Sequence, residues 1–204
     1  MDIQLNFINN SNDVNNSEIV IFQKNVANFD ELSVAWMVIR YCGVGDNYPF
    51  TFPMSMYVCA SDSWGNYSPQ LAAKTGDLFS MAFTTSGDRL LPSGNGTSPK
   101  EVQVRNELSK GAINASIYKS GKLLATKTSI APEQKAVFEF KPTIWIGVVS
   151  QIVQGEVMNS AIISDINTEL SLLGIASADI VMTGGGPGPN STPFSFNLEN
   201  IVMA

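Results

Sequence analysis

The stretch AINASIYKSGKLLATKTS, residues 112–129, decides the fold class. Apolar and small polar residues alternate on either side of its centre, over residues 112–118 and 123–129. Because successive side chains of a strand point to opposite faces, this alternation predicts two strands. The short polar turn between them ends in Gly121, and such a turn predicts that the two strands form a hairpin.

Working outward from this hairpin, similar short runs recur with turn-forming residues between them. The runs predicted as strands are residues 3–8, 18–23, 50–60, 78–84, 101–104, 112–118, 123–129, 136–140, 144–150, 169–173, 179–183 and 194–198. About a dozen short, mostly antiparallel strands with little helix indicate an all-β protein, a single jelly-roll-like β-sandwich. No linker is evident, so we expect one domain over residues 1–204.

Two segments need separate interpretation. In residues 32–42, Leu32, Ala35 and Ile39 fit a helical stripe, and Asn28 with Glu31 resembles a capping pair. The alternation of valines with Trp36 in the same segment favours a strand, which is the interpretation we adopt. The glycine-rich run at 184–190 can form neither a helix nor a central strand, so it predicts a loop.

The composition excludes several kinds of chemistry. The chain has no histidine, which removes Ser-His-Asp and Cys-His catalysis, and its only cysteines, Cys42 and Cys59, have no CxxC spacing. We therefore expect no catalytic residues, no metal, no cofactor and no enzymatic activity. A glycoside hydrolase that uses two carboxylates is a further alternative, because it needs no histidine. Its acids would be two of Asp46, Asp62, Asp77, Asp88, Glu101, Glu156 and Asp165.

The two cysteines and two polar turns allow structural interpretations. Cys42 and Cys59 are expected to be buried thiols rather than a disulfide. Residues 12–16 and 62–66 carry oxygen-bearing side chains at alternating positions, which could bind calcium. Neither has the glycine and glutamate of an EF-hand loop, and Asn and Asp commonly form turns, so we interpret both as turns.

Charge and the N-terminal residues bear on partners and compartment. A net charge of −6 disfavours binding to nucleic acid. It disfavours anionic membranes as well, whereas neutral membranes and glycans stay open as partners. The first residues, MDIQLN, have neither a basic nor an apolar region of a signal peptide. We expect synthesis in the cytoplasm, with later release possible.

Exposed aromatic residues indicate a candidate binding surface. Trp64 and Tyr67 lie in the polar, turn-like stretch 61–68, together with Asp62 and Asn66. Aromatic side chains in such a setting can stack on sugars or anchor a partner protein. These four residues are the predicted binding site. The alternative is that Trp64 folds back over the end of the sandwich.

The distribution of charge is the most unusual feature of the sequence. Residues 1–99 have a net charge of −5, residues 100–141 have +4, and residues 142–204 have −5 without any lysine or arginine. Edge strands are commonly protected by lysine, and this last segment has none. The segment either forms interior strands or faces another subunit. From the second interpretation we expect self-assembly into a homo-oligomer or filament, or binding to a partner through a surface.

A second function is compatible with the same sequence. The hairpin at 112–129 has the alternation that pore-forming toxins use when they insert strands into bilayers. Any half-buried hairpin shows this alternation too. The strand pattern resembles jelly-roll and cytolysin sandwiches in outline, but a shared architecture does not define a function. A membrane- or glycan-directed toxin is therefore the alternative to self-assembly.

Overall fold

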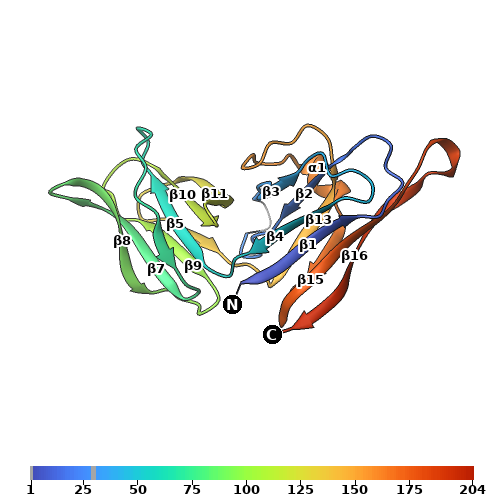
Figure 1. The fold of residues 1–204 in the computed structure, drawn as a ribbon. Coiled ribbons are helices and arrows are strands. Elements are labelled where there is room, and N and C mark those ends of the chain that lie inside the picture. The colour runs from blue at the N-terminus through green and yellow to red at the C-terminus, as the bar shows by residue number, and fades with distance from the viewer. Residues whose placement is uncertain (1, 29–30) are drawn as a thin grey trace. The chain divides into compact units, whose positions relative to one another are not determined.

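The computed structural model describes residues 2–28 and 31–204 and confirms an all-β protein, with 55% of residues in strands and 4% in helix. The chain divides into two compact units, each described by itself (Figure 1). Unit 1 consists of Met1–Gln23, Leu32–Met54 and Pro142–Ala204, and unit 2 consists of Lys24–Glu31 and Ser55–Lys141. The expected single sandwich is not confirmed, because the strands form four small sheets, two in each unit.

Unit 1 contains two four-stranded sheets. The first, sheet A, has the order β16-β15-β1-β4, and the second, sheet B, has the order β14-β13-β2-β3. Strand β1 pairs in parallel with β15 and antiparallel with β4. The strands of unit 1 are β1 (Ile3–Asn9), β2 (Glu18–Phe22), β3 (Met37–Ile39), β4 (Asn47–Phe52), β13 (Thr143–Val149), β14 (Thr168–Ser171), β15 (Ile175–Gly185) and β16 (Thr192–Met203).

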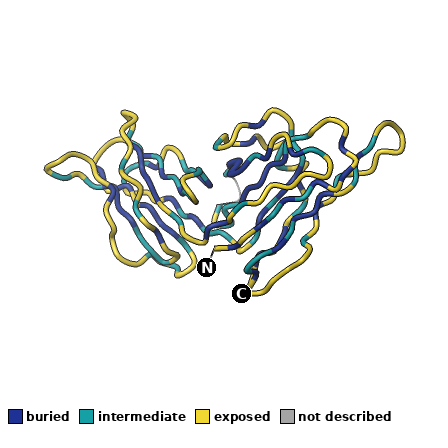
Figure 2. The backbone as a smooth tube through the Cα atoms, in the orientation of Figure 1, coloured by how far each residue is buried: buried dark blue, intermediate teal, exposed yellow. Residues whose placement is uncertain are grey.

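The core of unit 1 follows from the sequence pattern of its central strands. In β1, Ile3, Leu5 and Phe7 are buried while Gln4 lies outside, as alternation predicts (Figure 2). Trp36, just before β3, packs its ring edge against Phe52 of β4 with ring centroids 5.3 Å apart. This contact joins the buried faces of the two sheets.

Strand β2 is buried on both of its faces. One face of sheet B is covered by the segment 150–166, whose Ile152, Met158 and Ile166 form a cluster with Val20 and Phe22. This segment includes the short helix α1 (Ser160–Asp165), which begins where Asn159 accepts a hydrogen bond from the N–H of Ile162. Within the described part of the chain, no helix has the length and apolar character needed to cross a membrane.

Unit 2 also contains two four-stranded sheets, with the orders β11-β10-β5-β6 and β12-β9-β7-β8. The expected hairpin is confirmed as β10 and β11, and the turn residues Ser120 and Gly121 both have positive φ angles, as a tight hairpin turn requires. The strands of unit 2 are β5 (Met56–Ser61), β6 (Leu71–Ala73), β7 (Asp77–Thr84), β8 (Gly87–Asn95), β9 (Val102–Asn106), β10 (Ile113–Lys119), β11 (Lys122–Ile130) and β12 (Lys135–Phe138).

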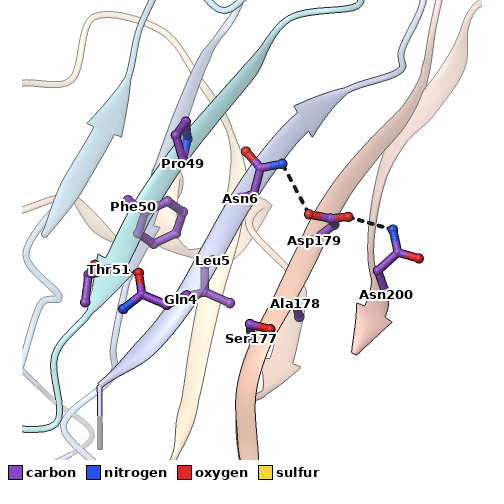
Figure 3. Close-up of a pocket in the computed structure, with 10 residues that line it drawn as sticks. All are labelled: Gln4, Leu5, Asn6, Pro49, Phe50, Thr51, Ser177, Ala178, Asp179 and Asn200. Carbon is purple, nitrogen blue, oxygen red and sulfur yellow. Dashed lines mark hydrogen bonds between the residues drawn. The ribbon is translucent and has the colours of Figure 1, made fainter. Parts of the chain in front are cut away.

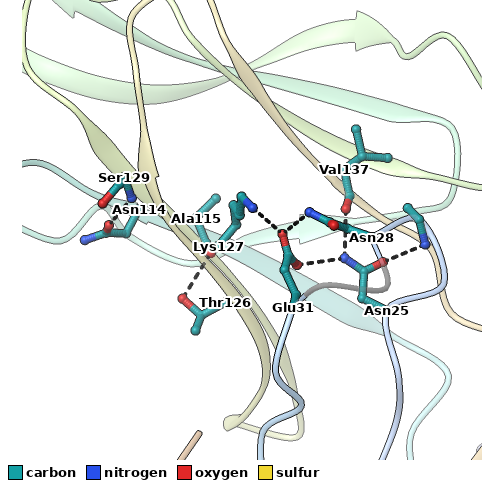
Figure 4. A network of polar contacts seen from close by, with 10 residues as sticks. Asn25, Asn28, Glu31, Asn114, Ala115, Thr126, Lys127, Ser129 and Val137 are labelled. Carbon is teal, nitrogen blue, oxygen red and sulfur yellow. Dashed lines mark hydrogen bonds and ion pairs between the residues drawn. The ribbon is translucent and has the colours of Figure 1, made fainter. Parts of the chain in front are cut away.

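Polar contacts attach the segment 24–28 and Glu31 to unit 2 (Figure 4). The Glu31 carboxylate forms an ion pair with Lys127 at 2.9 Å and accepts hydrogen bonds from the amides of Asn25 and Asn28. The Asn25 amide also donates to the carbonyl of Val137. The contact between Asn28 and Glu31 therefore exists, but it lies within the loop segment and caps no helix, and the contacts to Lys127 and Val137 hold the segment to unit 2.

Three sequence predictions are corrected. The run 50–60 is not one strand, because the chain leaves β4 at Phe52, passes Pro53 and begins β5 at Met56 in the other unit. The strand adopted for 32–42 is confirmed for residues 37–39 alone, and the helical alternative for this segment is wrong. Strands β6 and β8 were not predicted at all.

Candidate functional site

The candidate site is a cleft in unit 2, with a volume of about 440 Å³. Three chain segments form its walls: the turn after β5, the β7–β8 hairpin, and the loop 107–112 that leads into β10. The volume lies within the range of about 300–1,000 Å³ that is usual for small-molecule sites. The residues that line it are Asp62, Ser63, Trp64, Phe83, Asp88, Leu108, Ser109, Lys110, Gly111 and Ala112.

The turn after β5 is held by the carboxylate of Asp62. Its Oδ1 atom accepts hydrogen bonds from the backbone N–H groups of Trp64 and Asn66, each at 2.9 Å. Its Oδ2 atom accepts a hydrogen bond from the Asn66 side-chain amide at 2.8 Å. Gly65 supplies the positive φ of 86° that this tight turn needs. The result is that Trp64 lies at a fixed turn and is 87% exposed.

Hydrogen bonding also sets the ionisation of Asp62. The side-chain hydrogen bond from Asn66, followed by the backbone hydrogen bonds, lowers the pKa of Asp62 below its ordinary value. A carboxyl group with a lowered pKa stays ionised at neutral pH and is a poor proton donor. Asp62 therefore suits the positioning of the turn, and it does not suit the general acid of a glycoside hydrolase.

The second wall comes from the β7–β8 hairpin. Phe83 and Asp88 are directly opposite each other in the register of the two strands, so their side chains lie on the same face. Both line the cleft, and Phe83 is 77% exposed. The cleft therefore has an exposed phenylalanine on one wall and an exposed tryptophan on another.

The third wall is the loop 107–112, which is anchored by Asn106. This side chain is fully buried, and its amide donates to the carbonyls of Gly111 and Ile130, both at 2.9 Å. Its Oδ1 atom accepts a hydrogen bond from the N–H of Leu108 at 3.0 Å. Three bonds from one buried side chain fix the loop that presents Lys110 to the cleft.

The cleft contains part of the predicted site and residues that the prediction missed. Asp62 and Trp64 line it, whereas Asn66 only supports Asp62. Tyr67 does not line the cleft, and it forms a β-bridge with Ser61. The pKa of Tyr118 is raised mainly by burial, then by Cys59 and then by Tyr67. The missed residues Phe83, Asp88 and Lys110 come from segments well separated along the chain from the Trp64 turn.

Other predicted features have structural roles. Cys42 and Cys59 are both buried free thiols, and burial, together with the charge of Asp46, raises the pKa of Cys42. Asp13 accepts hydrogen bonds from the N–H groups of Asn15 and Ser17, which forms the predicted turn. Within residues 2–28 and 31–204, no group of three or more cysteine or acidic side chains is placed to hold a metal ion.

These features define a two-unit, all-β protein with an aromatic, partly charged cleft in one unit. Comparison with protein families adds a relationship: the model of the RhiA family matches residues 2–173. The chain belongs to the RhiA family. No curated protein and no solved structure matches it.

Proposed function

We propose that this chain is a non-enzymatic binding protein whose cleft in unit 2 takes a glycan. The observation that carries the proposal is the pairing of two exposed aromatic side chains, Trp64 and Phe83, over a cleft with Asp88 and Lys110 on its walls. Aromatic faces stack on the apolar faces of sugar rings, and charged side chains bind their hydroxyl groups.

A glycan array with the native protein and matched variants tests this proposal. Trp64→Ala removes an aromatic face of the cleft, while Tyr67→Ala removes an exposed aromatic three residues away that does not line it. We expect the native protein and Tyr67→Ala to bind the same glycans and Trp64→Ala to lose at least tenfold in affinity. Native protein that binds no glycan, or Trp64→Ala with native affinity, would refute the proposal.

Self-assembly is the second candidate, and the distribution of charge over the two units favours it. Unit 1 carries nine acidic residues and one basic residue, Arg40, for a net charge of −8. Unit 2 carries eleven basic and nine acidic residues, for a net charge of +2. Unit 1 of one copy can therefore attract unit 2 of another, which is a head-to-tail contact.

The edge strand β16 offers a place for such a contact. It is twelve residues long, with Ile201, Val202 and Met203 exposed near its end and no lysine or arginine. The other edges of unit 1 are protected, because β3 and β14 are short and β4 contains Pro49. Light scattering at low and high salt tests self-assembly: we expect larger species at low salt that dissociate as salt rises. A monomer at every concentration in low salt would exclude it.

A toxin that acts on membranes is the remaining alternative. It would require β10 and β11 to leave the sheet in which β10 also pairs with β5. The side chain of Lys119, which such a hairpin would have to present to water, is buried. Release of dye from neutral liposomes would favour this alternative, and intact liposomes would favour glycan binding or self-assembly.

A further inference from the structure

A second hollow lies in unit 1, on the outer face of sheet A (Figure 3). Its volume is about 380 Å³, and strands β4, β1, β15 and β16 contribute to it. Strand alternation sends Leu5 and Ala178 into the core and leaves their neighbours on the outer face. The polar side chains that line the hollow are Gln4, Asn6, Thr51, Ser177, Asp179 and Asn200.

The carboxylate of Asp179 is held in this hollow by two neutral amides. Asn6 donates to its Oδ1 atom at 3.2 Å, and Asn200 donates to its Oδ2 atom at 2.6 Å. Asn200 has a positive φ of 50° and lies where the register between β15 and β16 shifts, which is a β-bulge. Bulges commonly redirect a side chain, and this one directs Asn200 to Asp179. The carboxylate retains acceptor capacity beyond these two bonds.

The surroundings of Asp179 are rich in acceptors and negative charge. Glu199 is its direct partner across the ladder, and like charges at such positions repel each other. The Oδ1 atom of Asn6 is buried and has no hydrogen-bond partner among the described residues. A buried acceptor without a donor carries a free-energy cost, and it adds no positive charge or donor to the surroundings of Asp179.

Unit 1 does not supply a cation of its own for this hollow. Its one basic residue, Arg40, is bound elsewhere: it pairs with Glu18 at 2.9 Å and donates to the carbonyl of Ile152 at 2.6 Å. A cation that enters the hollow therefore meets Asp179 without competition from a basic side chain of the same unit.

We propose that this hollow binds an alkylammonium group. Such a group carries one positive charge and three hydrogen-bond donors. The charge balances that of Asp179, and the donors bond the acceptor capacity that the Asp179 carboxylate retains. The group can come from a free polyamine or from a lysine side chain of a protein. The inference is independent of glycan binding, because the hollow shares no residue with the cleft of unit 2.

Titration of the ¹⁵N-labelled protein with spermidine, followed by NMR, tests this inference. We expect the side-chain amide signals of Asn6 and Asn200 to shift most, and the shifts to weaken as salt is added. A peptide with one free lysine, compared with the same peptide acetylated on that lysine, distinguishes the two sources of the group. If spermidine binds and neither peptide does, the source of the group is a free polyamine. If the unacetylated peptide binds as well, lysine side chains of proteins are also a source.

Two variants with the same change in net charge separate a local site from general attraction. Asp179→Asn keeps the shape of the side chain, and we expect it to weaken spermidine binding at least tenfold. Asp165→Asn removes an acid of α1 outside the hollow, and we expect a change of less than twofold. Equal effects of the two variants, no shift of Asn6 and Asn200 in the native protein, or binding of calcium there without binding of amines would overturn the proposal. Trp64→Ala should bind spermidine like the native protein.

Discussion

Replacing Asn106 by alanine should destabilise unit 2 by about 3 kcal/mol, since each of three hydrogen bonds contributes about 1 kcal/mol. The side chain is fully buried and bonds the carbonyls of Gly111 and Ile130 and the N–H of Leu108. The bonds to the Ile130 carbonyl and the Leu108 N–H are fully buried. The substitution would leave that carbonyl without this donor and that N–H without this acceptor, away from water. The same change should weaken ligand binding, because the loop 107–112 forms one wall of the cleft.

Urea unfolding followed by far-ultraviolet circular dichroism measures this loss. Asn114→Ala is the matched control, because Asn114 is an asparagine of unit 2 with two side-chain hydrogen bonds. Its bond to Ser61 is part-buried and its bond to Ser129 is exposed. We expect it to cost less than about 1 kcal/mol. A loss below about 1 kcal/mol for Asn106→Ala, or losses that are equal for the two variants, would show that Asn106 does not anchor the loop.

Three further changes test the core and the turns of unit 1. Gly147→Ala should lower the free energy of unfolding in urea by about 1–3 kcal/mol, because a Cβ there would lie 2.7 Å from the Cγ1 atom of Ile166. In the double variant, Ile166→Ala removes that clash, so part of the loss caused by Gly147→Ala should be recovered. Trp36→Ala should cost about 3–5 kcal/mol, because its ring is almost fully buried between the sheets; a cost under about 1 kcal/mol would contradict that role. Burial raises the pKa of Asp13, but hydrogen bonds led by that from Ser17 outweigh it, so the pKa is lowered. Its stabilisation is present at neutral pH and is lost as pH falls into the acid range, so the stability gap between native protein and Asp13→Asn should narrow from pH 7 to pH 3.

Sequence alone predicted several strands to within one residue, among them β1 and β10, whose burial alternates, and β2, which is buried on both faces. The predictions for 3–8, 112–118 and 123–129 differ from β1, β10 and β11 by at most one residue at each end. Strand β8 was missed because only Leu90 of its nine residues is buried, and an exposed edge strand shows no apolar alternation. Its Pro92 also argued against a strand, although edge strands tolerate proline.

The division into two units was not predicted, because it depends on long-range pairing. Residues 50–60 form one nearly continuous run of strand-like residues, yet β4 pairs with β1 and β5 pairs with β10. Nothing local in the run shows that its two halves join sheets in different units. Pro53, which cannot donate a backbone hydrogen bond, was the one local sign of a break.

The candidate cleft was predicted in part, and the missed part has a physical reason. Trp64 was found because a large aromatic residue in a polar turn has no obvious core to join. Phe83 carries the same signal, since it precedes the polar turn Thr84-Thr85-Ser86-Gly87. Lys110 carries none, because its position in the cleft depends on Asn106, whose buried side chain fixes the loop.

The three charge blocks of the sequence become two in the folded chain, and this restricts how copies can associate. Folding places the acidic C-terminal segment and four of the nine acidic residues of residues 1–99 in unit 1, and it places all basic residues except Arg40 in unit 2. A symmetric contact between two copies of unit 1 would bring two charges of −8 together, which is unfavourable at low salt. A contact between unit 1 and unit 2 of different copies lowers the electrostatic energy instead. One such contact per copy is heterologous and leads to a closed ring or an open filament, whereas two reciprocal contacts between a pair of copies form a two-fold dimer in which each unit 1 meets a unit 2.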